Sequence, residues 1–321
     1  MRPGHYVCMP SALHDGRAPS KDDPMPDRVS MQDPRNQYPR PPFPRQPQAE
    51  PGLAAKMTPR PDHGEDSYAG HGRLKGRKAL ITGGDSGIGR ATAIAYAREG
   101  ADVAIAYLPS EETDAREVVA LIEKAGVKAL ALPGDVRDEA WNAAMVARVA
   151  EAFGGLDILV VNAGHQQFRE DVSEISTTDF DATMKTNLYA LHWLCQAAAP
   201  HLPPGASIIT TASIQAYEPS DILLDYATTK AGIVAYTKAL AKQMIDKGVR
   251  VNAVAPGPFW TVLQPSGGQP QNKVEQFGGH SAFGRPGQPV EIAPVYVLLA
   301  SQEASFVTGE VWGVTGGAGV G

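Results

Sequence analysis

Tyr226 and Lys230 are the residues of this 321-residue chain whose types and spacing most directly suggest chemistry. Of the ten tyrosines, Tyr226 alone is followed by a lysine four residues later, and on a helix that spacing places both side chains on one face. A neighbouring ammonium favours phenolate, so the pair predicts a tyrosine pKa lowered from its reference value of about 10 toward neutrality. Such a phenol could give a proton to a carbonyl oxygen or take one from an alcohol. A half-buried tyrosine beside a solvated lysine has the same spacing, so the pair alone leaves both interpretations open.

The elements that must position this pair are short apolar strands alternating with longer amphipathic helices from Lys78 onward. The expected strands are 79–82, 102–107, 128–132, 158–161, 207–210, 249–254 and 311–314, and the expected helices are 87–99, 111–124, 138–153, 179–199, 224–246 and 290–300. Strict alternation with strands that are apolar throughout indicates a parallel sheet covered on both faces. The predicted fold is therefore α/β, a doubly wound parallel sheet of about seven strands in three layers.

The turn between the first expected strand and helix is rich in glycine, in the stretch Thr82-Gly83-Gly84-Asp85-Ser86-Gly87-Ile88-Gly89. Glycine permits a tight turn and a close approach of backbone to ligand, and a helix N-terminus offers free amides and a positive dipole end. Because this cluster follows a buried strand and opens a helix, it predicts a pyrophosphate-binding turn. The residues assigned to it are Gly83, Asp85, Ser86, Gly87, Ile88 and Gly89.

The spacing Thr-Gly-x-x-x-Gly-Ile-Gly resembles the single-domain branch of the short-chain dehydrogenase/reductase family, and further landmarks of that family follow in order. They are Asp135 and Val136 after the third strand, Asn162, Ala163 and Gly164 after the fourth, Asn187 in the long helix, Ser213 after the fifth strand, then Tyr226 and Lys230, and Pro256, Gly257 and Thr261 after the sixth. The resemblance covers residues 74–321 and implies a catalytic domain with a Rossmann fold. It also implies an NAD(P)-dependent oxidoreductase that acts on a carbonyl or alcohol substrate.

The resemblance implies a role for each polar landmark. Tyr226 would be the general acid or base, Ser213 a donor to the carbonyl oxygen, and Lys230 the residue that lowers the tyrosine pKa and binds the nicotinamide ribose. Asn187 would hold a water in a proton relay. Residues expected to bind the cofactor are those of the glycine turn together with Tyr107, Asp135, Val136, Asn162, Ala163, Gly164, Tyr226, Lys230, Pro256, Gly257, Phe259 and Thr261. Taken one at a time, Ser213 could simply end a strand, Asn187 could bond a helix carbonyl, and Asn162 could be a turn residue.

The choice between NAD and NADP depends on the end of the second strand, where an acid favours the free 2′-hydroxyl and a base the 2′-phosphate. The residues there are Tyr107, Leu108, Pro109 and Ser110, followed by Glu111 and Glu112. The acid is displaced from the strand end, yet that loop contains no lysine or arginine. The sequence therefore leans slightly toward NAD.

The expected substrate pocket combines an apolar wall with a few amides, which suits a small or medium carbonyl compound. Its expected lining is Gln166, Ile214, Gln215, Phe259 and Trp260, with His165 either binding a substrate oxygen or simply solvated. The Gly-, Pro- and Gln-rich loop from Val262 to Phe283 is expected to be a mobile lid. No metal site is expected, because the sequence shows no group of His, Asp, Glu or Cys at ligand spacing.

Residues 1–73 form a separate segment that contains 14 of the chain's 27 prolines. Proline removes backbone donors and pushes its preceding neighbour out of the helical region, so we expect an extended segment without regular elements. It could be a disordered tail or an arm along the body or a second subunit. The stretch from Pro51 to Pro59 is similar to bacterial general-stress oxidoreductases with a proline-rich extension, which favours an ordered arm after about Gln37. The first thirty residues are expected to be disordered and dispensable, and translation could begin at Met25 or Met31.

Composition excludes several classes of function. A net charge of −6 argues against nucleic-acid or anionic-membrane partners, and no apolar run approaches the roughly 20 residues of a membrane span. The only cysteines, Cys8 and Cys195, are in unlike contexts, which favours a reducing cytoplasm. The family resemblance implies a homotetramer. Two alternatives to a reductase are a non-redox epimerase or dehydratase on the same fold, and a cofactor-binding stress or regulatory protein without turnover.

Overall fold

The computed structural model describes residues 30–320, in which seven parallel strands form one sheet in the order β3-β2-β1-β4-β5-β6-β7. The strands are β1 (Lys78–Thr82), β2 (Asp102–Tyr107), β3 (Ala129–Pro133), β4 (Ile158–Val161), β5 (Ser207–Thr211), β6 (Arg250–Pro256) and β7 (Val311–Val314). Their order reverses between β1 and β4, which start the two halves of the sheet. In a doubly wound sheet, ligands bind at the carboxyl ends of the strands beside this reversal.

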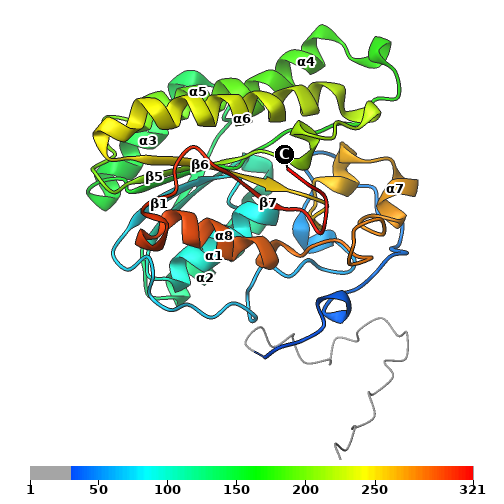
Figure 1. The fold of residues 1–321 in the computed structure, drawn as a ribbon, viewed down its shortest axis with the longest axis horizontal. Helices are drawn as coiled ribbons and strands as arrows, with labels where there is room; N and C mark the ends of the chain where they lie inside the picture. The colour runs from blue at the N-terminus through cyan, green and yellow to red at the C-terminus, as the bar shows by residue number, and fades with distance from the viewer. Residues whose placement is uncertain (1–29, 321) are drawn as a thin grey trace, which may run out of the picture.

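Helices cover both faces of the sheet, so the molecule has three layers, as Figure 1 shows. One face carries α1 (Gly87–Arg98), α2 (Glu112–Lys124) and α8 (Pro289–Ala300), and the other carries α3 (Glu139–Phe153), α4 (Thr177–Met184), α5 (Ala190–Ala198) and α6 (Leu224–Met244). Two apolar cores follow from this, one on each side of the sheet. The predicted fold class is confirmed. Within residues 30–320 no helix is both long and apolar enough to cross a membrane.

Two features of the helices differ from the sequence-based expectation. The long helix expected over 179–199 is divided into α4 and α5 by a single π turn, Lys185–Tyr189, which contains Asn187. Such π turns inside helices are frequent at functional sites. A short helix, α7 (Gln271–Glu275), lies in the segment that was expected to be a loop. Element ends otherwise shift by one or two residues, as when β3 begins at Ala129.

The arm, residues 30–73, runs along the body of its own chain, and its first anchor is aromatic. Phe43 is buried, and its ring centroid lies 4.2 Å from that of Trp260. The indole nitrogen of Trp260 donates a hydrogen bond of 2.9 Å to the carbonyl of Pro59. The arm was expected to lack regular elements, but it contains two single 3₁₀ turns, Pro34–Asn36 and Ala54–Lys56. The expectations about the first residues, including Cys8 and Met25, fall on 1–29, outside the described part.

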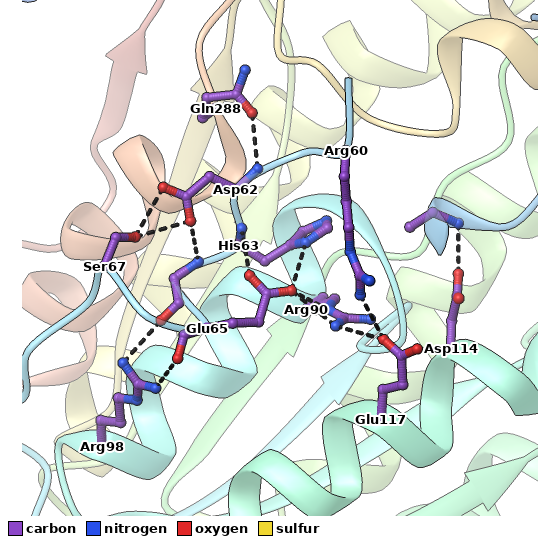
Figure 2. A network of polar contacts seen from close by, with 12 residues as sticks. Arg60, Asp62, His63, Glu65, Ser67, Arg90, Arg98, Asp114, Glu117 and Gln288 are labelled. Atoms are coloured by element: carbon purple, nitrogen blue, oxygen red, sulfur yellow. Dashed lines mark hydrogen bonds and ion pairs between the residues drawn. The ribbon is translucent and has the colours of Figure 1, made fainter. Parts of the chain in front are cut away.

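The second anchor of the arm is a network of polar contacts, drawn in Figure 2. Arg90 of α1 is buried and donates to Glu65 of the arm at 2.8 Å and to Glu117 of α2 at 3.0 Å. Burial by itself raises the pKa of Glu65, but the hydrogen bond and charge of His63 and the charge of Arg90 outweigh it and lower that pKa well below its usual range. Arg98 donates to three arm carbonyls, among them that of Gly64 at 2.9 Å. Detachment of the arm would therefore leave the buried Arg90 with Glu117 as its one ion-pair partner among the described residues and would remove the three carbonyls to which Arg98 donates.

Candidate active site

A cavity of about 1230 Å³ opens at the carboxyl ends of the strands, and residues following every one of the seven strands contribute to its wall. Most of the residues singled out from the sequence lie in this wall. They are Gly83, Asp85, Ser86, Gly87, Ile88, Tyr107, Asp135, Val136, Asn162, Ala163, Gly164, His165, Gln166, Ser213, Ile214, Gln215, Tyr226, Lys230, Pro256, Gly257, Phe259 and Thr261. Parallel strands bring these positions together because their carboxyl ends meet at one edge of the sheet.

The glycine turn is shaped so that side chains could not replace its glycines. Gly83 and Gly87 have φ values of +64° and +52°, a region that L side chains rarely adopt. A Cβ atom on Gly89 would lie 1.9 Å from the carbonyl oxygen of Gly83, so Gly89 allows α1 to pack against the turn and does not itself line the cavity. No side chain caps the N-terminus of α1 at Ser86. A tight turn followed by an uncapped helix N-terminus at a cavity fits the pyrophosphate of a dinucleotide.

Ser213, Tyr226 and Lys230 converge in the cavity, and all three side chains are buried. The Lys230 ammonium lies 5.2 Å from the centroid of the Tyr226 ring and donates a hydrogen bond of 2.8 Å to the carbonyl of Thr211. The backbone amide of Gln215 donates to Ser213 Oγ at 3.1 Å, so the serine's own hydrogen stays available for another acceptor.

The pKa of Tyr226 shifts in the opposite direction to the lowering that was expected from the spacing of Tyr226 and Lys230. Burial raises the pKa of Tyr226 to about 12, although a hydrogen bond with Ser213 lowers it in part. Burial lowers the pKa of Lys230 to about 8. Burial penalises the charged form of each group, and the lysine is drawn toward Thr211, so desolvation outweighs the attraction between ammonium and phenolate.

Asn187 lies behind the cavity wall and fixes the loop that follows β4. Its amide oxygen accepts from the backbone nitrogen of His165 at 2.8 Å, and its amide nitrogen donates to the His165 carbonyl at 3.0 Å and to Thr229 at 2.9 Å. Thr229 in turn donates to the carbonyl of Tyr226 at 2.7 Å. Asn187 therefore ties this loop to the helix that carries Tyr226.

Asn162 likewise holds two loops together, at the end of β4. Its side-chain amide donates to the carbonyls of Thr82 and Gly83, both at 3.2 Å, while its backbone amide donates to the hydroxyl of Thr82 at 3.0 Å. The end of β4 is thereby fastened to the glycine turn. Asn162 also lies in the cavity wall, so its role exceeds that of a simple turn residue.

Carboxylates gather at the end of the cavity formed by Tyr107 and the glycine turn. Asp85 and Glu111 both lie in the wall there. Burial raises the pKa of Asp85, and burial together with the charge of Asp85 raises that of Glu111. Asp135 lies in the wall too and is paired with Arg137 at 2.6 Å.

Comparison with known proteins identifies the family to which this chain belongs. The family model described as "Enoyl-(Acyl carrier protein) reductase" matches residues 83–319. Over 287 residues the chain is 58% identical to the uncharacterized oxidoreductase YghA of Escherichia coli (strain K12), covering 89% of this chain and 98% of that one. The chain belongs to the short-chain dehydrogenase/reductase family. The family predicted from the ordered landmarks is thus confirmed.

Other relatives of this short-chain dehydrogenase/reductase include the general stress protein 39 of Bacillus subtilis (strain 168), 47% identical over 84% of this chain and 93% of the relative. The glucose and ribitol dehydrogenase of Daucus carota is 40% identical over 86% of this chain and 96% of its own. A short chain dehydrogenase from Burkholderia cenocepacia J2315, solved in complex with NADP, superposes with a TM-score of 0.72 at 37% identity, covering 76% of this chain and 98% of that one. The protein is an NAD(P)-dependent oxidoreductase of this family, which acts on small molecules.

The sequence placed one residue wrongly in the cavity wall, Trp260, and missed another that lies there, Glu50. Trp260 was expected to line the substrate pocket, but it is fully buried under Phe43 and Pro59 of the arm and lies outside the cavity wall. Glu50 of the arm does lie in the wall, where its carboxylate meets His165. No local pattern could have indicated Glu50, because 115 residues separate it from its partner. Among the described residues, no cluster of three or more His, Cys, Asp or Glu could hold a metal ion.

Proposed function

We propose that the protein catalyses reversible reduction of an aldehyde or ketone to an alcohol, with Tyr226 as its acid and base. The observation that carries this proposal is the convergence of Ser213, Tyr226 and Lys230 on one cavity that also contains the glycine turn. A bound nicotinamide would supply the hydride in reduction and accept it in oxidation. The residues that would hold the dinucleotide are those of the glycine turn, with Asn162, Lys230 and Thr261.

Side chains of the protein transfer the proton and stabilise the negative charge that develops on the carbonyl oxygen. The Tyr226 hydroxyl gives its proton to the carbonyl oxygen of the substrate. Ser213, whose Oγ accepts from the Gln215 amide, donates its own hydrogen to that carbonyl oxygen. The Lys230 ammonium favours phenolate once the proton has left Tyr226. Asn187 keeps the neighbouring loop and helix in place for this exchange. It would also hold a water that links Lys230 to solvent, which would complete a proton relay.

The charges at the end of the cavity formed by Tyr107 and the glycine turn, where the adenosine would lie, affect the choice between NAD and NADP. Burial and the charge of Asp85 already disfavour a second carboxylate anion at Glu111, and a 2′-phosphate beside these two residues would add further negative charge, so they favour the free 2′-hydroxyl of NAD. The relative from Burkholderia cenocepacia was solved with NADP. Rates measured with NADH and NADPH under identical conditions decide this preference.

The relative from Daucus carota, a glucose and ribitol dehydrogenase, supports including sugars and alditols among the substrates tested. A panel of aldehydes, ketones and sugars with NADH and with NADPH, followed at the nicotinamide absorbance, tests the function. We expect turnover of at least one member and a loss of about 10²- to 10⁴-fold in Tyr226→Phe, the range for removing a general acid. Equal turnover in both proteins, or cofactor binding without oxidation across the whole panel, would refute it. The second result would favour a binding protein without turnover.

We also propose a homotetramer. Apolar side chains are exposed on the helices of one face, where Phe180 of α4, Tyr189 of the π turn and Leu224 of α6 have exposed fractions of 36%, 46% and 44%. Exposed apolar groups on one layer of a domain are typical of a surface between subunits. Light scattering after size-exclusion chromatography gives the mass, and a monomer would contradict the proposal.

A further inference from the structure

The arm carries a short segment, Gln48–Ala54, that contributes to the wall of the cavity; we name it the strap. Glu50 and Pro51 of the strap lie in the cavity wall, on the same surface as the glycine turn and the catalytic residues. In Figure 1 the arm, drawn in blue, passes beside α7 at the open end of the sheet. The strap is thus part of the site although it comes from outside the Rossmann fold.

The strap is fastened to different sides of the cavity. At its beginning, the Gln48 amide donates to the carbonyl of Pro265 at 3.1 Å, in the segment after β6. At its end, the Ala54 amide donates to Asp114 of α2 at 2.6 Å, a contact drawn in Figure 2. Asp114 lies on the adenosine side, where its charge raises the pKa of Asp85 in the glycine turn. The strap therefore bridges the two sides between which a dinucleotide would lie.

Glu50 makes a third attachment in the middle of the strap. One carboxylate oxygen lies 2.6 Å from Nδ1 of His165, and the other accepts from the side-chain amide of Gln167. Both partners belong to the loop after β4, which Asn187 holds through the backbone of His165. A Cβ atom on Gly164, next to His165, would lie 3.7 Å from the Lys230 ammonium. Glu50 is thus attached to the loop that runs beside the catalytic lysine.

The conformation of the strap is set before any ligand arrives. Gly52 has a φ of +78°, and a Cβ atom there would lie 2.6 Å from a methyl carbon of Val262. Within the strap, the side chain of Gln48 accepts from the Leu53 amide at 2.8 Å. A tight turn that is bonded at both ends and packed against Val262 presents Glu50 at one position. Preorganisation of this kind limits the entropy lost when a ligand is enclosed.

We propose that the strap completes the dinucleotide site and that Glu50 is a positioning residue that keeps the cofactor enclosed. This inference rests on the proposed cofactor site. Entry and release of NAD(H) or NADP(H) then require the strap to lift, which breaks the contacts of Glu50 with His165 and Gln167. The strap retards release without touching the proton chemistry.

The test measures cofactor binding and release without turnover. NADH and NADPH are titrated by fluorescence, and dissociation is followed by stopped flow after displacement, for the full-length wild type, Glu50→Gln and Glu170→Gln. Glu170 is exposed and lies outside the cavity wall, so its variant removes one carboxylate charge without altering the strap. We expect Glu50→Gln to release the cofactor about 3- to 10-fold faster, as for loss of one charge-assisted hydrogen bond, and Glu170→Gln to match the wild type.

Amide hydrogen exchange gives a second readout that does not depend on any variant. Saturating cofactor should slow exchange at Gln48, Leu53 and Ala54, because lifting the strap exposes their amides. Unchanged exchange at these amides, or release from Glu50→Gln at the wild-type rate, would overturn the inference while leaving the proposed function intact. A wild type that binds neither NADH nor NADPH would instead refute the proposed function itself.

Discussion

Replacing Phe43 by alanine tests how firmly the arm is joined to the body. The ring is 5% exposed, lies 4.2 Å from the Trp260 ring between centroids, and shares a cluster with Met57, Val262 and Val274. Truncating a buried phenylalanine costs about 3–5 kcal/mol, and we expect about 3 kcal/mol because the arm can relax into part of the space. Since every 1.4 kcal/mol is a factor of ten, the detached arm would become more populated by about 150-fold.

Amide exchange is the assay, because detachment exposes the Gln48 amide that is bonded to Pro265. We expect exchange at Gln48 to accelerate by about two orders of magnitude in Phe43→Ala, and cofactor release to accelerate with it. The matched control is Phe306→Ala, since Phe306 is fully exposed and its loss should change neither quantity. If Phe43→Ala and Phe306→Ala exchanged alike, the aromatic anchor would not hold the arm, and the reasoning would fail.

Two further predictions concern the catalytic domain. Gly89→Ala forces a Cβ atom against the Gly83 carbonyl. We expect urea unfolding to show a free energy of unfolding lowered by about 2 kcal/mol, and fluorescence titration to show NADH binding weakened by at least about 10-fold. Gly319→Ala, with open space around its Cβ position, should behave as wild type, and equal effects would refute the packing argument. Burial lowers the pKa of Lys230 to about 8, so its ammonium is lost as pH rises through that value, and kcat/KM for carbonyl reduction should decline above about pH 8. Lys230→Arg stays charged, and whatever activity it retains should lack that decline; the same alkaline limb in both proteins would assign the titration to another group.

Much of the catalytic domain could be predicted because its signals are local. Apolar strands such as Ile158–Val161 alternate with amphipathic helices, and each strand end contributes residues to one edge of a parallel sheet. The glycine turn could be recognised from spacing, since positive φ at Gly83 and Gly87 and the contact at Gly89 each require glycine. The part of the cavity wall that the strand ends and the glycine turn supply follows from these two facts.

The tertiary structure decided what depends on contacts between distant segments. Trp260 lies outside the cavity wall because the arm covers its indole, and Glu50, for which the sequence indicated no role, lies in that wall. Neither contact leaves a periodic pattern in the sequence. The sign of the Tyr226 pKa shift was also beyond the sequence. Spacing shows which charges are neighbours, whereas the pKa depends on how far burial removes each group from water, which only the assembled fold determines. The amino-acid sequence by itself thus predicted the fold and the residues proposed for catalysis, because both depend on local patterns and spacing. The contacts of the folded arm decided which other side chains surround those residues.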